Sequence, residues 1–273
     1  MAVITKIEVQ KRSKERFNIY IDKGQGEEYG FSVDQVILIK HGLQKGLEID
    51  EIELGNILYN EEVQKAYLQA ISYLSYQMRT KQEIEDFLRK KEVGQAIISE
   101  VVSKLLHDRY INDKEYAVLY TRTQSNVNRK GPTVIKRELL NKGVQDLIIT
   151  HSLQEYPKEK QIENALFLIE KKKKSYQKHS FLQMKLKLDE MLVRKGYSRE
   201  VIQICLEELK DEKDDEKQQE ALHYHGNKYY EKYKKHDGWT FENKMKQALY
   251  RKGFSIDEIE IFLQMKREEE RGE

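Results

Sequence analysis

The first part of the chain alternates apolar and polar residues. Residues 2–9 (AVITKIEV) and 17–22 (FNIYID) follow this period of two, which is typical of half-buried strands, and EYGFSV at 28–33 continues it. The pair Gly24-x-Gly26 indicates a hairpin turn, because no helix follows closely enough to form a phosphate-binding loop. We therefore expect three short antiparallel strands within residues 3–32.

A short helix is expected after these strands. The spacing Ser32-x-x-Gln35 predicts a capping box ahead of the apolar run VILI. The segment LEIDEIEL at 47–54 fits either a strand or a helix. Residues 1–57 are accordingly interpreted as a small mixed α/β amino-terminal domain.

From about residue 60, one pattern recurs four times. Its second copy reads Ile135-x-x-Glu138-Leu139-x-x-Lys142-Gly143-Val144. The position after the lysine holds Glu92, Gly143, Gly196 and Gly253 in the four copies, at spacings of 51, 53 and 57 residues. A repeat of this regularity is the signature of serial structural units.

Each part of the pattern suits the end of a helix. Apolar residues four apart share one helix face, and a lysine in the last turn suits the negative end of the helix dipole. Glycine adopts the left-handed conformation that ends a helix, and the next apolar residue packs back on the last turn. Because Glu92 replaces glycine in the first copy, we expect a weaker or differently shaped stop there.

A second helix is predicted after each stop and another before each motif. The helices before the motifs are expected at 60–78, 113–127, 157–176 and 212–235. Thr80-x-x-Glu83, Ser180-x-x-Gln183 and Pro132 after Gly131 are start signals for the middle helix. The expected fold is mainly α: serial three-helix repeats in an elongated, curved rod, preceded by a small α+β domain with a short antiparallel sheet. The predicted repeats span 58–111, 112–155, 156–210 and 211–273.

Composition narrows the class of protein. Only 38% of residues are apolar and 35% are charged, which favours slender modules over a thick core. The single cysteine, Cys205, lies on a predicted apolar stripe and excludes a disulfide framework or a thiolate-rich zinc site. The segment MAVITK lacks an apolar signal core and no stretch is long enough to span a bilayer, so we expect a cytoplasmic protein without membrane contact.

Charge is spread unevenly although the net charge is only +2. Residues 79–142 hold 14 basic and 9 acidic residues, and 154–197 hold 11 and 6, whereas 198–220 hold 4 and 9. Basic middle units and an acidic connector could meet a polyanion with one face. Solvated helix faces explain the same charges equally well.

One stretch of the second copy resembles a known family. Tyr110-Ile111-Asn112-Asp113-Lys114-Glu115-Tyr116-Ala117, followed by Lys130-Gly131-Pro132 and the motif ending in Gly143, is similar to the signature of the RecX family of RecA regulators. The likeness extends over the whole chain, although the first copy departs at Glu92 and the third and fourth lack the Asn-Asp pair. The resemblance implies a monomeric regulator without enzymatic activity or cofactor. Such a protein would lie along the groove of the RecA filament on single-stranded DNA and restrain ATP hydrolysis and strand exchange, with roles in recombination, DNA repair and the SOS response.

The candidate residues follow from the motif and from its charges. Exposed cations at matched or neighbouring positions are the candidates for contact with RecA or DNA: Arg129, Lys130, Lys136, Arg137, Lys142, Arg194 and Lys195. Residues with an expected structural role are Asp113 as a helix cap, Tyr116, Ala117 and Leu139 in packing, and Gly143, Gly196 and Gly253 as helix stops.

Other chemistry is disfavoured. His223-x-His225 places two rings on different sides of a helix, and the acidic run from Asp211 to Glu220 lacks the spacing of a calcium loop, so no metal site is expected. No nucleophile elbow or Walker loop occurs, which argues against an enzyme. The alternatives are a free-standing helical DNA-binding protein without RecA contact, because basic three-helix units also resemble helix-turn-helix readers, and a generic helical scaffold.

Overall fold

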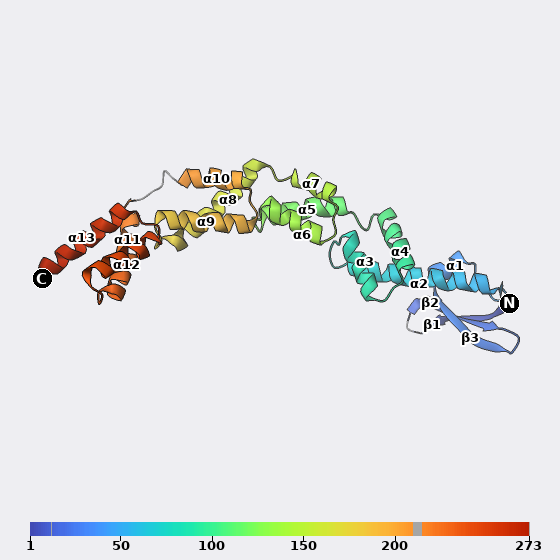
Figure 1. Cartoon of the computed structure of the whole chain (residues 1–273). Coiled ribbons are helices and arrows are strands. Elements are labelled where there is room, and N and C mark those ends of the chain that lie inside the picture. The colour runs from blue at the N-terminus through green and yellow to red at the C-terminus, as the bar shows by residue number, and fades with distance from the viewer. Residues whose placement is uncertain (12, 210–214, 273) are drawn as a thin grey trace. The chain divides into compact units, whose positions relative to one another are not determined.

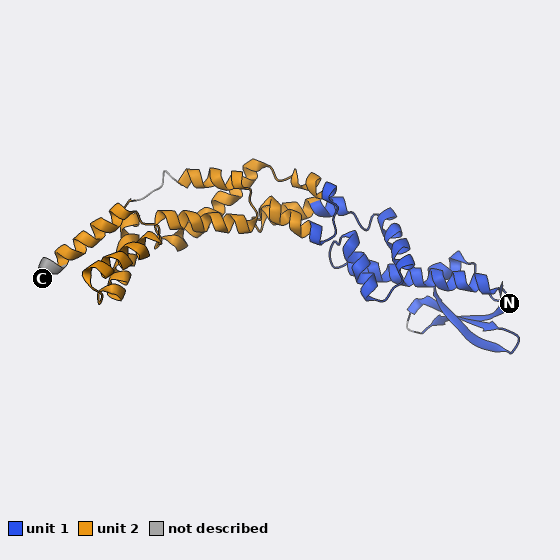
Figure 2. Cartoon of the chain, viewed as in Figure 1, with its two compact units in different colours: residues 1–117, 140–148 blue, residues 118–139, 149–273 orange. Residues whose placement is uncertain are grey.

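The computed structural model describes residues 1–11, 13–209 and 215–272. The chain divides into two compact units, residues 1–117 with 140–148 and residues 118–139 with 149–273 (Figure 2). The first unit contains the amino-terminal domain and the first repeat, and the second contains the third and fourth repeats. The helices of the second repeat contribute residues to both units.

The amino-terminal domain contains the three predicted strands, β1 (Ala2–Gln10), β2 (Ser13–Asp22) and β3 (Glu27–Asp34). A short fourth strand, β4 (Glu48–Ile49), completes an antiparallel sheet of order β3-β2-β1-β4. The hairpin turn at Gly24-x-Gly26 is confirmed: Asp22 Oδ1 accepts the backbone N–H groups of Gly24 and Gly26 at 2.7 and 3.0 Å. Buried aliphatic residues of β1, β2 and β3, including Ile4, form the core of this domain.

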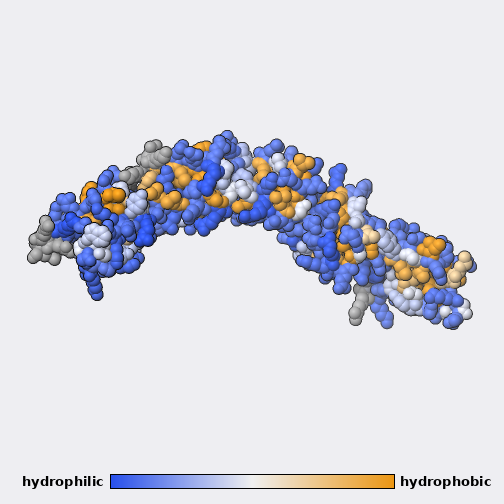
Figure 3. Space-filling model, in the orientation of Figure 1, coloured by the Kyte–Doolittle hydropathy of each residue, from blue (hydrophilic) through white to orange (hydrophobic). Residues whose placement is uncertain are grey.

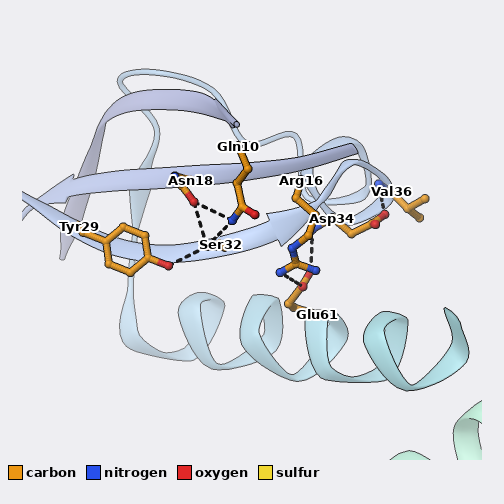
Figure 4. Close-up of polar contacts among 8 residues, drawn as sticks. All are labelled: Gln10, Arg16, Asn18, Tyr29, Ser32, Asp34, Val36 and Glu61. Carbon is orange, nitrogen blue, oxygen red and sulfur yellow. Dashed lines mark hydrogen bonds and ion pairs between the residues drawn. The ribbon is translucent and has the colours of Figure 1, made fainter. Parts of the chain in front are cut away.

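The short helix α1 (Gln35–Lys40) is confirmed, but the predicted capping box is wrong. Asp34 caps the helix by accepting the N–H of Val36 at 2.9 Å. Ser32 lies inside β3, where its hydroxyl bonds to Gln10, Asn18 and Tyr29 (Figure 4). Because β3 continues to Asp34, the carboxylate immediately before the helix is the side chain that reaches its free amides.

The ambiguous segment 47–54 forms both kinds of structure. After β4, Asp50 and Glu53 form a capping box that begins α2 (Glu51–Leu74). Arg16 of β2 pairs with Glu61 of α2 at 2.7 Å, and Glu61 also accepts the N–H of Asp34 (Figure 4). The predicted domain boundary at 57/58 therefore falls inside one continuous helix that is tied to the sheet.

The rest of the described chain forms the predicted three-helix repeats (Figure 1). In the first repeat, α2 is followed by α3 (Lys81–Lys90) and α4 (Gln95–His107). The second repeat contains α5 (Asp113–Asn126), α6 (Pro132–Asn141) and α7 (Asp146–Leu153). The third contains α8 (Lys158–Lys173) with the 3-10 turn η1 (Lys174–Tyr176), α9 (Phe181–Lys195) and α10 (Arg199–Glu208). The fourth contains α11 (Asp215–Tyr233), α12 (Gly238–Tyr250) and α13 (Ile256–Gly272). The mainly α fold is confirmed, and the elongated rod stays a prediction.

Buried side chains show that the repeats have cores of their own. The first, third and fourth repeats each contain a separate cluster of buried apolar residues. Cys205 belongs to the cluster of the third repeat, and burial raises the pKa of its thiol to about 11, as expected for a packing residue. Ser152, the polar residue on the apolar stripe of α7, donates to the Ile149 carbonyl and pairs with the hydroxyl of buried Thr121.

The four middle helices end in the same backbone conformation. Gly143, Gly196 and Gly253 have φ values of 75°, 90° and 83°, and Glu92 has a φ of 60°. In the first repeat the N–H of Val93 bonds back to the Leu88 carbonyl, as the corresponding N–H groups do after Gly196 and Gly253. The expected difference in shape is therefore wrong, because the glutamate adopts the left-handed conformation despite its β-carbon. The expected weaker stop stays a prediction.

We predict that Glu92→Gly stabilises the first repeat by about 0.5–1 kcal/mol. Glycine removes a left-handed penalty of about 1–2 kcal/mol, and its extra freedom in the unfolded chain offsets about half of that gain. Hydrogen exchange resolved by peptide over residues 81–107 measures the effect. Glu92→Ala keeps the β-carbon and should give no gain, whereas lower protection in Glu92→Gly would contradict the prediction.

Candidate interaction surface

Consecutive repeats meet where the start of one middle helix lies against the stop of the next. The carbonyl before each stop glycine accepts a hydrogen bond from the residue that precedes the earlier helix. Thr80 Oγ1 donates to the Lys142 carbonyl and the N–H of Gly131 to the Lys195 carbonyl, both at 2.7 Å, and Ser180 Oγ donates to the Lys252 carbonyl at 2.5 Å. We call each of these contacts a joint. Within the second unit, α6, α9 and α12 therefore follow one another end to end (Figure 1).

The stop glycines are required both because their backbone is left-handed and because a β-carbon would overlap the neighbouring repeat. A β-carbon at Gly143 would lie 2.3 Å from that of Gln82, at the start of α3. One at Gly196 would lie 2.6 Å from the backbone nitrogen of Val134, and one at Gly253 2.6 Å from Ser180 Oγ. Glu92 is exposed, and within the described ranges no other repeat bonds to the carbonyl before it. A side chain is tolerated at this stop because the joint is missing there.

Asp113 caps a helix, but not its own. Asn112 Oδ1 accepts the free amides at the start of α5, whereas Asp113 Oδ1 accepts the N–H of Lys81, the first residue of α3, at 2.8 Å. Burial raises the pKa of the Asp113 carboxyl. In the same way, Gln218 Oε1 accepts the N–H of Phe181, the first residue of α9, at 2.9 Å. Pro132 at the start of α6 has no N–H to satisfy. Asp113 therefore belongs to the first joint.

The other signature residues lie where the sequence predicted packing. Ala117 and Leu139 are fully buried, and the ring of half-buried Tyr116 lies 5.6 Å from Lys142 Nζ. At the second joint, Tyr197 is buried, and burial, with a hydrogen bond to Tyr156, raises the pKa of its hydroxyl. These side chains pack within the repeats and at their joints.

Several of the candidate cations are not exposed, which corrects the sequence-based expectation. Lys142 pairs with Glu83 across the first joint at 2.7 Å; burial lowers its pKa, but the bonds to Glu83 and Tyr116 outweigh this and leave the pKa raised. Lys130 binds both carboxylate oxygens of Glu138, at 2.6 and 2.9 Å. Lys195 Nζ donates to the Asn128 carbonyl at 3.2 Å.

Arg129 and Lys136 are half-buried as well. The guanidinium of Arg129 lies 3.8 Å from the centre of the Phe167 ring, and its backbone carbonyl accepts the hydroxyl of Tyr197 at 2.9 Å. The local backbone of Arg129 is left-handed, with a φ of 47°. Sequence patterns could not show this, because the partners of these cations lie up to 68 residues away in the chain.

Arg137 and Arg194 are the two candidates that are exposed. Arg194 lies two residues before a stop, and the same position holds exposed Lys90 in the first repeat and exposed Arg251 in the fourth. We call Lys90, Arg194 and Arg251 the stop-proximal cations. Aligning the four stops in the sequence would have revealed Lys90 and Arg251. The face drawn in Figure 3 is mainly hydrophilic, with smaller hydrophobic patches.

The two histidines of the fourth repeat have different partners. The ring of His223 packs edge-on against Phe262 with centroids 5.6 Å apart, while His225 Nε2 lies 2.8 Å from the Lys178 carbonyl. In the described ranges there is no group of three residues suited to hold a metal ion. Residues 211–214 of the acidic run lie outside the described residues, and Asp215 begins α11. None of the described helices combines the length and the apolar character needed to cross a bilayer.

A four-stranded α+β domain and serial three-helix units joined through their helix stops define a helical-repeat protein. Family models match each of these parts. The model of the regulatory protein RecX N-terminal domain matches residues 2–50, those of the first and second RecX three-helix domains match 66–105 and 112–153, and that of the third matches both 159–206 and 215–263. The chain belongs to the RecX family of regulatory proteins.

Individual proteins give the same result. "Regulatory protein RecX" of Bacillus cereus strain G9842 is 98% identical over 98% of this chain and its own full length, and that of Bacillus thuringiensis strain Al Hakam is 97% identical over the same shares. The crystal structure of a regulatory protein RecX covers 75% of this chain and 98% of its own, with 34% identity and a TM-score of 0.67. The structure of RecX from Lactobacillus salivarius covers 55% and 98%, with 38% identity and a TM-score of 0.53.

Proposed function

We propose that this chain binds along the filament that RecA forms on single-stranded DNA and restrains ATP hydrolysis and strand exchange. It would act in the cytoplasm as a monomer without a cofactor, and so take part in recombination, DNA repair and the SOS response. The regulatory family supports this role. The same proposal keeps the five-part division of the chain at 1–57, 58–111, 112–155, 156–210 and 211–273, since every part has a counterpart among the family models.

The observation that carries the proposal is the recurrence of the stop-proximal cations. Lys90, Arg194 and Arg251 occupy one position of the first, third and fourth repeats and are exposed in each case, whereas the second repeat has Asn141 at this position. A cation near the end of a helix suits the helix dipole, but an exposed one contributes little to folding, so its recurrence also favours a partner that presents acidic groups at intervals. Weak contacts of this kind add through effective concentration when they lie on linked repeats.

We expect the purified chain to inhibit RecA-dependent ATP hydrolysis and strand exchange when it is titrated into RecA on single-stranded DNA. Binding to RecA-coated strands should exceed binding to naked strands or duplexes at each salt concentration tested. Equal binding to naked and coated strands, with no change in either RecA activity at molar excess, would favour the alternative of a free-standing DNA-binding protein.

A triple variant tests which cations face the filament. Lys90→Gln, Arg194→Gln and Arg251→Gln together should weaken filament binding about tenfold, at about 0.5 kcal/mol for each exposed ionic contact, and flatten its salt dependence. Arg129 and Lys130 are left in place because their neutralisation would remove contacts with Phe167 and Glu138.

The matched control removes the same amount of charge from the amino-terminal domain. Lys11→Gln, Lys14→Gln and Lys45→Gln change exposed lysines outside the repeats, so filament affinity should stay within about twofold. Equal losses in the two triple variants would mean that net charge, rather than the repeat position, governs binding.

A further inference from the structure

The tryptophan of the fourth repeat is placed where the other repeats form their joints. Trp239 is the second residue of α12 and is 80% exposed. The second residues of α3 and α9 are Gln82 and Leu182, whose β-carbons lie close to the stops Gly143 and Gly253. The second residue of α6, Thr133, donates its N–H to the carbonyl of Gly196 at 3.1 Å. At α12, within the described ranges, no stop covers this position.

At 80% exposure the ring contributes little to folding the repeat. Repeat proteins usually place polar residues on a surface that no neighbouring repeat covers, because an apolar surface there promotes association. Single exposed apolar residues are ordinary, but a tryptophan beside charged groups is a candidate for binding, since the ring gains most of its energy when a partner desolvates it. Among the described residues of the fourth repeat, Trp239 is the most exposed large apolar side chain.

Three lysines precede the ring in the sequence. Lys232, Lys234 and Lys235 are all exposed at the end of α11 and in the turn that leads to α12, while His236 Nε2 lies 2.9 Å from Lys244 Nζ. Lys234 also pairs with Glu231, and Lys232 lies near the Tyr233 ring, whereas no ion pair of Lys235 is found among the described residues.

The acidic groups nearby are already engaged within the fourth repeat. Asp237 accepts the N–H and the hydroxyl of Thr240 at 2.8 and 3.0 Å, and the bond from this backbone amide lowers the pKa of its carboxyl. Glu242 pairs with Arg267 of α13. Asp237 keeps its negative charge in these bonds, so the positive charge beside the exposed ring comes from Lys232, Lys234 and Lys235.

This combination selects one class of partner. A single strand of nucleic acid offers unpaired bases that stack on an aromatic ring and phosphates that pair with nearby lysines. A duplex keeps its base faces stacked inside the helix, and an acidic protein surface would use the lysines but leave the ring exposed. We propose that Trp239 stacks on a base of single-stranded DNA while Lys232, Lys234 and Lys235 contact the flanking phosphates.

The proposal rests on the proposed function only in its choice of DNA strand, and it can be tested without RecA. Trp239 is the one tryptophan of the sequence, so the fluorescence of the full chain reports on this position alone. Titration with a short oligodeoxynucleotide should quench the emission saturably, and the affinity should fall as salt is raised. A duplex of the same sequence should give little quenching.

Variants read with a labelled oligodeoxynucleotide separate the ring from its surroundings. Trp239→Ala should weaken binding about 5- to 150-fold, which is the stacking value of about 1–3 kcal/mol converted at 1.4 kcal/mol for each factor of ten. Trp239→Phe should retain most of the affinity because a ring remains. Tyr76→Ala, which removes an 83% exposed ring from the first unit, is the matched control and should leave affinity unchanged.

Four results would overturn the assignment. They are strand binding without quenching, no strand binding by the wild-type chain, quenching by RecA without DNA, and a change in emission on raising the protein concentration alone. The last two would assign Trp239 to a RecA surface and to a second copy of this chain. Inhibition of RecA without strand-dependent quenching would remove this inference but leave the proposed function intact. Quenching without inhibition would support this inference and contradict the proposed function.

Discussion

Gly131→Ala is expected to separate the second repeat from the third. A β-carbon at residue 131 would lie 2.3 Å from the carbonyl carbon and oxygen of Gly196 and 2.4 Å from the nitrogen of Tyr197. All three are backbone atoms, so no side chain can rotate to relieve the overlap. We expect a loss of about 3 kcal/mol, the upper part of the range for overpacking.

A loss of stability in Gly131→Ala would come from the joint, because the same substitution without the overlap would stabilise the chain. The backbone of Gly131 is not left-handed, so alanine would otherwise stabilise the chain by about 0.4–1 kcal/mol. Hydrogen exchange should show faster opening of peptides from α6 and from the end of α9, and the proposed inhibition of RecA should weaken if it needs linked repeats. Gly94→Ala is the control, because a β-carbon at this helix cap meets nothing within 4 Å. If Gly131→Ala and Gly94→Ala had the same free energy of unfolding, the close approach at this joint would contribute nothing to stability.

Gly143→Val should destabilise the first joint by about 2–5 kcal/mol. The left-handed conformation, with a φ of 75°, accounts for about 1–2 kcal/mol, and the overlap with Gln82 adds about 1–3 kcal/mol. Thermal unfolding and hydrogen exchange over residues 81–90 and 140–148 measure the loss.

A second glycine separates the two contributions to this loss. Gly42 has a φ of 57°, and a β-carbon there would meet nothing within 4 Å. Gly42→Val should therefore cost only the conformational part, about 1–2 kcal/mol. An equal loss in Gly42→Val and Gly143→Val would show that the close approach to Gln82 is relieved at no cost.

Local sequence signals predicted what local physics determines. The three strands, the four stops and the helix starts at Thr80, Pro132 and Ser180 were visible because periodicity, glycine and capping chemistry act within a few residues. Ser32 failed as a cap because Asp34 competes for the same amides from a closer position. Glu92 failed as an altered stop because the bond from Val93 to Leu88 holds the turn without glycine.

The joints could not be predicted, because they pair residues that are distant in the sequence. The contact from Thr80 to Lys142 spans 62 residues and that from Ser180 to Lys252 spans 72. For the same reason Lys142 and Lys195 were expected to be exposed, although their partners Glu83 and Asn128 partly bury them. Exposed Arg194 was predicted correctly, while its counterparts Lys90 and Arg251 were missed because the cations were not aligned on the stops.

Each joint has a direction, and this has a consequence for how such a protein can change length. A repeat offers the start of its middle helix to the next repeat and its stop to the previous one, so an inserted copy in register carries both halves of a joint. The third and fourth repeats match the same family model, and their joint uses a serine hydroxyl and a lysine carbonyl as the first uses a threonine and a lysine. Tandem duplication of the second or third repeat, each of which has a glycine stop, would therefore yield compatible neighbours without compensating substitutions elsewhere.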